Sequence, residues 1–264
     1  MASHPNRPEL SLIVPLYNEA ACMVENLKEM LAYLDMSGFS YELVLVNDGS
    51  TDATEVLCKH LSEDNASIRL ISGAVNRGKG WAVKTGVLKA RGNYIIFTDA
   101  DLAVPIRFVE PLLKELRKAA PVVIGSRHLA NSSLKVREGA GRQLLGEVFR
   151  RVTQWGLSLR VSDITCGFKG FTRSTAMDIF SRSVIHGWGY DAEILFLAQE
   201  LGYPIREIPV DWYHSFDSKV KVGLDSLHTL GELLCIHYYQ RTGRYLLPNK
   251  VIKAKNNRER SAWC

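Results

Sequence analysis

Asp99 and Asp101 stand two residues apart, directly after the apolar run 94–98, and are the side chains of this sequence best suited to hold a cation. Side chains two apart on an extended segment point the same way, so both carboxylates can reach one ion. Hard cations such as Mg²⁺ and Mn²⁺ prefer oxygen ligands and often keep phosphates as further ligands. An Asp-x-Asp pair also occurs by chance in solvated loops, but the buried strand predicted just before it favours the cation site.

Polar residues also follow two other apolar runs. The run 10–16 leads into Tyr17 and Glu19, and the run 41–46 leads into Asp48. Asp48 could be an ordinary turn residue before a helix, or a carboxylate that accepts a hydrogen bond from a nucleobase. Tyr17 and Glu19 admit the same two interpretations. Because ligands of open α/β sheets bind at the carboxyl ends of the strands, the three clusters together predict one shared site.

The elements that must position these residues alternate between strand and helix. Strands are predicted at 10–16, 41–46, 68–72 and 94–98, and helices at 20–34, 52–61 and 78–90. Parallel strands need crossover connections, so this order predicts an α/β fold with a mainly parallel, Rossmann-like sheet flanked by helices. The second half adds expected helices at 106–118, 144–159, 191–201 and 224–239, strands at 122–126 and 205–210, and a strand or loop at 168–171. We expect one continuous domain over 1–222 and a C-terminal amphipathic helix with a basic tail over 223–264.

The composition excludes several classes of protein. Apolar residues make up 46% of the 264 residues and charged residues 23%, which is ordinary for a globular protein. The five cysteines are widely spaced and form no Cys-x-x-Cys pair, which argues against a disulfide framework or a structural zinc site. No apolar run approaches the roughly 20 residues that span a bilayer. We therefore expect a cytoplasmic protein whose contact with a membrane, if any, is peripheral.

Four motifs of the first half, taken together, resemble those of family 2 glycosyltransferases with the GT-A fold. They are Pro-x-Tyr-Asn-Glu at 15–19, Asn-Asp-Gly-Ser-x-Asp at 47–52, Asn-x-Gly-Lys-Gly at 76–80 and Asp-x-Asp at 99–101. Asn47 replaces the first aspartate of the family's second motif. Segments 125–127, 163–169 and 189–193, with Trp212 and Ser218-Lys219, resemble dolichyl-phosphate glucosyltransferases and bacterial polyprenyl-phosphate glycosyltransferases. The resemblance covers roughly residues 10 to 222, in order.

The resemblance implies a role for each matching residue. The nucleotide sugar would be bound by Pro15, Tyr17, Glu19, Asp48, Lys79, Asp99 and Ala100. A Mg²⁺ or Mn²⁺ ion would be bound by Asp99 and Asp101. The acceptor or other phosphates would be bound by Arg127, Arg142 and Lys219, and the catalytic residues would be Asp191, as a base or as a carboxylate that positions the acceptor, and Arg127. Family members often have a polar residue at the position of Ala103, so one metal contact here would go to water.

The implied activity is the inverting transfer of a hexose from a nucleotide sugar to a polyprenyl phosphate, with UDP-glucose favoured over GDP-mannose. A phosphate monoester is already largely ionised at pH 7, so it needs positioning and charge screening more than a base. Arg127→Ala is therefore expected to lower activity far more than stability. Helices 144–159 and 224–239, which carry Trp155 and Leu234, could meet a peripheral membrane surface or pack as ordinary helices.

Three alternatives keep parts of this interpretation. A soluble glycan, protein or small molecule could be the acceptor, and Asp191 would then act as a true base. A non-catalytic nucleotide-sugar-binding module is disfavoured because the acidic and basic site residues are all present. A nucleic-acid partner is not expected, since the net charge of +5 comes without any known reader motif. Gly78-Lys79-Gly80 lacks the Walker spacing and is not a phosphate loop of that kind.

Overall fold

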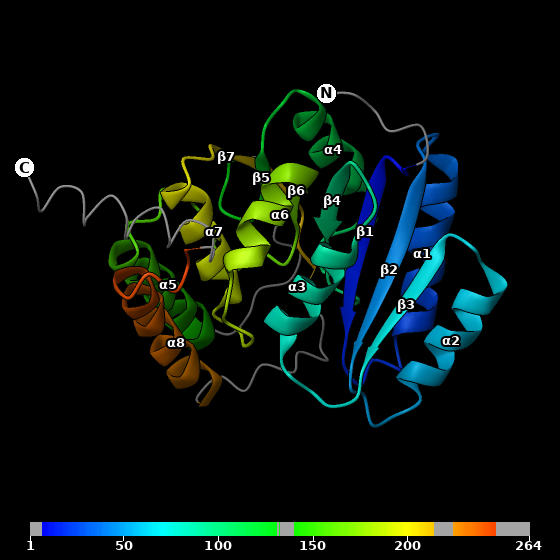
Figure 1. Ribbon diagram of the computed structural model, residues 1–264, viewed down its shortest axis with the longest axis horizontal. Coiled ribbons are helices and arrows are strands. Elements are labelled where there is room, and N and C mark those ends of the chain that lie inside the picture. Colours follow the sequence, from blue (N-terminus) through cyan, green and yellow to red (C-terminus); the bar gives the residue numbers. More distant parts are fainter. Residues whose placement is uncertain (1–6, 131, 133–139, 214–223, 247–264) are drawn as a thin grey trace, which may run out of the picture.

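The computed structural model describes residues 7–130, 132, 140–213 and 224–246. Their strands form one seven-stranded sheet in the order β3-β2-β1-β4-β6-β5-β7 (Figure 1). The strands are β1 (Leu10–Leu16), β2 (Tyr41–Asp48), β3 (Ile68–Gly73), β4 (Tyr94–Phe97), β5 (Val122–Ser126), β6 (Lys169–Thr172) and β7 (Ile205–Pro209). Only β6 runs antiparallel to its neighbours within this sheet. The predicted α/β fold with a mainly parallel sheet is confirmed.

Helices cover both faces of the sheet. They are α1 (Met23–Met36), α2 (Thr54–Asp64), α3 (Lys79–Lys89), α4 (Val109–Arg117), α5 (Ala140–Gly156), α6 (Arg173–Arg182), α7 (Tyr190–Glu200) and α8 (Leu224–Arg241). Alternate residues of β1 point to opposite faces, so that Leu12 packs with α1 and α4 while Ile13 packs with α3 and α6. The sheet that positions the polar clusters is therefore packed between two hydrophobic cores, one on each face.

Two elements differ from the sequence-based expectation. The segment predicted as a strand or loop at 168–171 is β6, and it inserts between β4 and β5 with antiparallel pairing to both. The helix α6 was not predicted, because its polar sequence RSTAMDIFSR has few apolar residues to show a helical period. It is nevertheless held by burial of Ile179 and Phe180 in the core beneath α3. The expected helix at 106–118 begins as a 3₁₀ turn, Ile106–Phe108, before α4.

The C-terminal helix α8 packs on the rest of the chain. Leu233 and Ile236 are buried in the core, and Tyr245 beyond the helix is buried beside them. His237 Nε2 lies 2.7 Å from the carbonyl oxygen of Gly156, so the C-terminal end of α5 and the helix α8 are in contact. The expected domain boundary at 222/223 lies at the edge of a segment outside the described residues and stays a prediction. The four described cysteines are unpaired. None of the helices described combines the length and the apolar character that a bilayer crossing demands.

Candidate active site

The three predicted polar clusters meet at one edge of the sheet. Strand β1 pairs in parallel with β2 on one side and β4 on the other, so their carboxyl ends lie together. The loops after β1 and β2 are also tied directly, because the backbone N–H of Asn18 donates to Ser50 Oγ at 2.9 Å and that of Glu19 donates to Thr54 Oγ1 at 2.8 Å. Tyr17 is 37% exposed at this edge. The sequence-based expectation of convergence is confirmed.

Asp48 holds the loop that leads into α3. Its two carboxylate oxygens accept the backbone N–H groups of Arg77 and Gly78 at 2.9 and 2.8 Å. Burial raises the pKa of Asp48, and these two hydrogen bonds partly offset the rise. Gly78 has a φ of 105°, and a Cβ there would lie 2.4 Å from the carbonyl oxygen of His186. Asp48 thus shapes the loop around the site, and its contact with a nucleobase stays a prediction.

Asp99 and Asp101 lie where the metal site was expected. Asp99 Oδ1 is 2.6 Å from Lys79 Nζ, and Asp101 Oδ1 accepts the backbone N–H of Ala103 at 3.0 Å. Asp99 also lies against Gly167, where a Cβ would come within 2.1 Å of Asp99 Oδ2. Burial raises the pKa of Asp101, and the neighbouring Asp99 carboxylate raises it further. Two oxygen donors that repel each other in this way form a set that a hard divalent cation fits.

The protein alone supplies an incomplete metal shell. The described residues contain no group of three or more histidine, cysteine, aspartate or glutamate side chains able to hold an ion. Phosphate oxygens and water would therefore complete the coordination, as is usual for Mg²⁺. The assignment of Asp99 and Asp101 as metal ligands stays a prediction.

Asp191 lies in the first turn of α7 and forms a buried ion pair. Lys169 Nζ is 2.5 Å from Asp191 Oδ1 and 2.6 Å from the carbonyl oxygen of Cys166. Lys169 is completely buried, and its ammonium also lies 5.7 Å from the ring centroid of Phe97. Burial raises the pKa of Asp191, while the charges of Lys169 and Lys79 partly offset that rise. Lys169 lies in the motif at 163–169, but no role was predicted for it from the sequence.

The ammonium of Lys79 interacts with both Asp99 and Asp191. Burial alone would lower the pKa of its ammonium, but the charges of Asp99 and Asp191 outweigh burial and raise it. The sequence-based prediction placed Lys79 among the residues that bind the nucleotide sugar. In the structure its side chain, 20% exposed, extends to the carboxylate pair.

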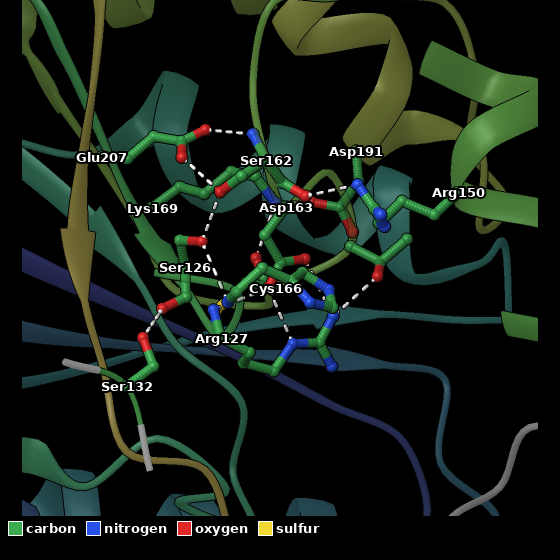
Figure 2. Close-up of polar contacts among 12 residues, drawn as sticks. Ser126, Arg127, Ser132, Arg150, Ser162, Asp163, Cys166, Lys169, Asp191 and Glu207 are labelled. Atoms are coloured by element: carbon green, nitrogen blue, oxygen red, sulfur yellow. Dashed lines mark hydrogen bonds and ion pairs between the residues drawn. The ribbon is translucent and has the colours of Figure 1, made fainter. Parts of the chain in front are cut away.

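Arg127, at the end of β5, is anchored by Asp163 (Figure 2). Its Nε and Nη2 donate to Asp163 Oδ2 and Oδ1 at 2.8 and 2.9 Å, and Nη2 also donates to Thr165 Oγ1 at 2.8 Å. The guanidinium lies 5.6 Å from the ring centroid of Trp212. Burial alone would raise the pKa of the fully buried Asp163, but Arg127 outweighs burial and lowers that pKa to about 2. Arg127 is thus part of a buried ion pair, which corrects the expectation that its removal leaves stability almost unchanged.

A second polar network holds the segment that carries Asp163. Ser162 Oγ lies 2.6 Å from Ser126 Oγ, and the backbone N–H of Ser162 donates to Glu207 Oε1 at 2.5 Å (Figure 2). Arg150 of α5 donates to the carbonyl oxygen of Ser162 at 3.1 Å. The segment before β6 is thereby fixed to β5, β7 and α5 together. Glu207 and Ser162 are 45 residues apart, and no spacing in the sequence indicates their contact.

The remaining predicted residues are placed as follows. Pro15 is partly buried at the end of β1, and the carbonyl oxygen of the buried Ala100 accepts Asn26 Nδ2 at 2.9 Å. The backbone of Arg142 belongs to α5, but its side chain lies outside the described residues, as does the whole of Lys219. The structure therefore brings together the first-half residues with Asp191 and leaves the roles of Arg142 and Lys219 as predictions.

Helix α8 fixes the start of α7. Glu232 Oε2 accepts the backbone N–H of Gly189 at 2.7 Å, just before the turn that carries Asp191. A Cβ on Gly189 would come within 2.9 Å of the Glu232 carboxylate, and one on Gly187 within 2.2 Å. A small pocket opens beside this turn between α5, α7 and α8, and its lining includes Thr153, Trp188, Asp191 and Leu233. This contact could not be predicted from the sequence. Glu232 belongs to no motif, and it lies 43 residues from Gly189.

Comparison with known proteins agrees with this geometry. The model of the family "Glycosyl transferase family 2" matches residues 11–184. The dolichyl-phosphate beta-glucosyltransferase of Dictyostelium discoideum is 37% identical over 257 residues, covering 93% of this chain and 77% of the relative. The Homo sapiens enzyme of the same name is 35% identical over 256 residues, covering 90% of this chain and 78% of the relative.

Solved structures share the fold. Glucosyl-3-phosphoglycerate synthase from Mycobacterium tuberculosis, in complex with Mn²⁺, UDP-glucose and phosphoglyceric acid, superposes with a TM-score of 0.66 at 21% identity. The superposition covers 88% of this chain and 80% of that one. At this identity the likeness concerns the fold alone. Together with the family match over more than half of its length, it identifies the chain as a member of glycosyl transferase family 2 with a GT-A-like fold.

Proposed function

We propose that this protein transfers glucose from UDP-glucose to dolichyl phosphate or a related polyprenyl phosphate, with inversion at the anomeric carbon. One observation carries the proposal. The chain keeps 37% identity over 93% of its length to a dolichyl-phosphate beta-glucosyltransferase. The meeting of its acidic motif residues and Lys79 at one sheet edge agrees with this likeness. Membership of family 2 supports hexose transfer. The names of the Dictyostelium and human relatives support glucose as the sugar and dolichyl phosphate as the acceptor.

The donor would lie across the carboxyl ends of β1, β2 and β4. Pro15, Tyr17, Glu19 and Asp48 line the edge at which base and ribose would bind. Asp99 and Asp101 would hold a divalent cation, which when bound stabilises the charge that develops on the leaving diphosphate. Mn²⁺ and UDP-glucose occur together in the M. tuberculosis synthase of the same fold, which supports a divalent ion and a uridine donor here.

The acceptor phosphate would lie near Asp191. A phosphate monoester has a second pKa of about 6, so its oxygen attacks without first losing a proton to a base. Asp191 is held at 2.5 Å by the buried ammonium of Lys169, an arrangement that fixes the carboxylate in place. We propose that Asp191 positions the acceptor and that Lys79 screens the negative charges that meet there.

The acceptor lipid requires access to a membrane. Helices α5 and α8 lie side by side at one end of the molecule (Figure 1), and they expose large apolar side chains. Trp155 of α5 is 87% exposed, and Leu234 and Tyr238 of α8 are 71% and 63% exposed. Arg151 is exposed on α5 as well. An exposed apolar surface of this kind fits the boundary between the headgroups and acyl chains of a bilayer, so we propose that this pair of helices rests on the membrane.

The test is a transfer assay read by mass spectrometry. Purified protein is given UDP-glucose or GDP-mannose, a short polyprenyl phosphate, and Mn²⁺ or Mg²⁺. The proposal predicts a glucosyl-phosphoryl-prenol from UDP-glucose that disappears with EDTA. Hydrolysis of the donor without lipid product would refute the lipid acceptor and leave the glycosyltransferase class standing. A mannosyl product alone would refute the donor.

A variant separates the two acceptor classes. If the acceptor is a phosphate, Asp191→Asn keeps a polar side chain of similar size and leaves measurable turnover. If the acceptor is a hydroxyl group of a soluble glycan, protein or small molecule, the same change removes the base and abolishes turnover. Asp191→Asn also removes the carboxylate partner of the buried Lys169 ammonium, so circular dichroism first verifies that the variant is folded. Residual glucosylation of the polyprenyl phosphate by the folded variant is the expected result.

A further inference from the structure

The ammonium of Lys79 occupies the acidic cluster, which we define as Asp99, Asp101 and Asp191. Lys79 Nζ lies 2.6 Å from Asp99 Oδ1, and the two side chains are 20% and 32% exposed. The same ammonium lies 5.4 Å from the ring centroid of Trp188. Asp99, Asp191 and Asp101 all act on it electrostatically. A built-in cation therefore sits on one of the two carboxylates expected to bind the metal.

Both partners of this contact have firmly placed backbones. Lys79 opens α3 between two glycines, and a Cβ on Gly80 would lie 2.6 Å from Tyr190 Cβ. The backbone N–H of Trp81 donates to the carbonyl oxygen of His186 at 3.2 Å, which fastens this turn to the segment before α7. Asp99 lies directly against Gly167. The contact is thus built into the fold, while the long stem of Lys79 leaves its ammonium able to turn elsewhere.

The charges explain what this arrangement does. The three carboxylates of the acidic cluster face the ammonium groups of Lys79 and Lys169. The Glu19 carboxylate also acts on Asp101, and the Arg127 guanidinium on Asp191. A divalent ion arriving alone would have to displace the Lys79 ammonium from Asp99 and would leave that ammonium without its carboxylate partner. A diphosphate brings two or more negative charges and offers Lys79 a new partner.

We infer that Lys79 is an internal competitor of the divalent metal, so that the metal binds tightly only together with the nucleotide diphosphate. On arrival of the diphosphate the ammonium leaves Asp99 for a phosphate oxygen, and Asp99 becomes a metal ligand. This coupling is reciprocal: the diphosphate raises the affinity for the metal by the same factor by which the metal raises the affinity for the diphosphate. The inference rests on the proposed function only in taking a nucleoside diphosphate as the ligand.

The test measures Mn²⁺ affinity without any sugar transfer. Free Mn²⁺ is followed by electron paramagnetic resonance during titration of wild type, Lys79→Met, Lys79→Arg and Lys89→Met, each with and without UDP. Lys89 is exposed on the same helix and controls for the loss of one positive charge. We expect Lys79→Met to bind Mn²⁺ at least tenfold more tightly than wild type without UDP, and to lose most of the gain that UDP brings. Lys79→Arg and Lys89→Met should follow wild type.

Two results would overturn the inference. If Lys79→Met without UDP binds Mn²⁺ no more tightly than wild type, Lys79 does not compete with the metal. If Lys89→Met gains affinity as much as Lys79→Met, the effect is one of overall charge and not of this contact. Transfer activity is measured separately, so that a protein with the expected metal coupling but no lipid product refutes only the proposed acceptor. Circular dichroism verifies that each variant is folded.

Discussion

Replacing Arg127 by alanine tests a buried ion pair that holds the site. The change removes the guanidinium while the backbone N–H of residue 127 still reaches Asp163 Oδ2 at 3.0 Å. Asp163 is completely buried, so its carboxylate loses the charged partner while remaining inside the protein. The carboxylate then stands buried with a single hydrogen bond, which is the costly state of a charged group in a protein interior.

The magnitude follows from the contacts. Two side-chain hydrogen bonds to a charged acceptor are lost, at 2.8 and 2.9 Å, each of a kind that contributes about 1.5–3 kcal/mol. Breaking a buried pair by removing one partner typically costs about 3–5 kcal/mol, in the same range. The lowering of the Asp163 pKa from 3.8 to about 2 corresponds to only about 2 kcal/mol, because burial of the carboxylate opposes it. We therefore expect Arg127→Ala to lower the free energy of unfolding by about 3–5 kcal/mol at pH 7.

Urea denaturation at pH 7 and pH 5 measures this change. Without Arg127, burial raises the pKa of Asp163, so protonation relieves the variant as the pH falls and its deficit shrinks at pH 5. Arg151→Ala serves as control, because its ion pair with Glu147 is 74% exposed on the arginine side and its loss should leave the midpoint unchanged within error. A deficit below about 1 kcal/mol that does not depend on pH would refute the view that this buried pair holds the site.

Three further predictions concern Gly167, the Arg127–Asp163 pair at acid pH, and the exposed side chains of α5 and α8. Gly167→Ala pushes the Asp99 carboxylate aside, since the new Cβ would lie 2.1 Å from Oδ2, and should weaken Mn²⁺–UDP binding at least tenfold in calorimetry. In wild type the Arg127–Asp163 pair contributes stability that is present above pH 3.8 and lost as the pH falls through about 2, so acid denaturation should steepen in that window. The double substitution Trp155→Glu and Leu234→Glu places charge on the surface proposed to meet the membrane and should abolish sedimentation with anionic vesicles. The melting temperature should stay unchanged, because both side chains are exposed.

The sequence sufficed to predict the sheet edge and its first-half residues. Strands 10–16, 41–46 and 94–98 carry strong apolar runs, and the rule that ligands bind at strand carboxyl ends places Asp48 and Asp99 together without knowledge of any contact. The antiparallel strand β6 could not be predicted in this way. Its four residues, KGFT, have neither the length nor the alternation that would fix its direction, which is set by pairing with β4 and β5.

The partners of the charged residues were the other gap. Arg127 and Asp163 are 36 residues apart, and Lys169 and Asp191 are 22 apart. All four residues lie in motifs that resemble those of the family. The motifs predict which residues take part in catalysis or binding, but they do not predict which residues form ion pairs with each other. Burial and the fold determine the pairing. A charged group inside the protein is stable only beside a partner, and the fold brings only certain charged groups close enough. Lys79 is the plainest example, because its motif suggested contact with the nucleotide sugar and the structure places its ammonium on Asp99.

The anomeric configuration of the product tests the central claim most directly. Wild-type protein would be incubated with UDP-glucose, Mn²⁺ and a short polyprenyl phosphate, and the purified glycolipid examined by nuclear magnetic resonance. In-line attack by the acceptor phosphate on an α-linked donor predicts a β-glucosyl phosphodiester. An α-linked product would contradict a single inverting displacement at this site, and glucose attached anywhere but to the phosphate would contradict the proposed acceptor.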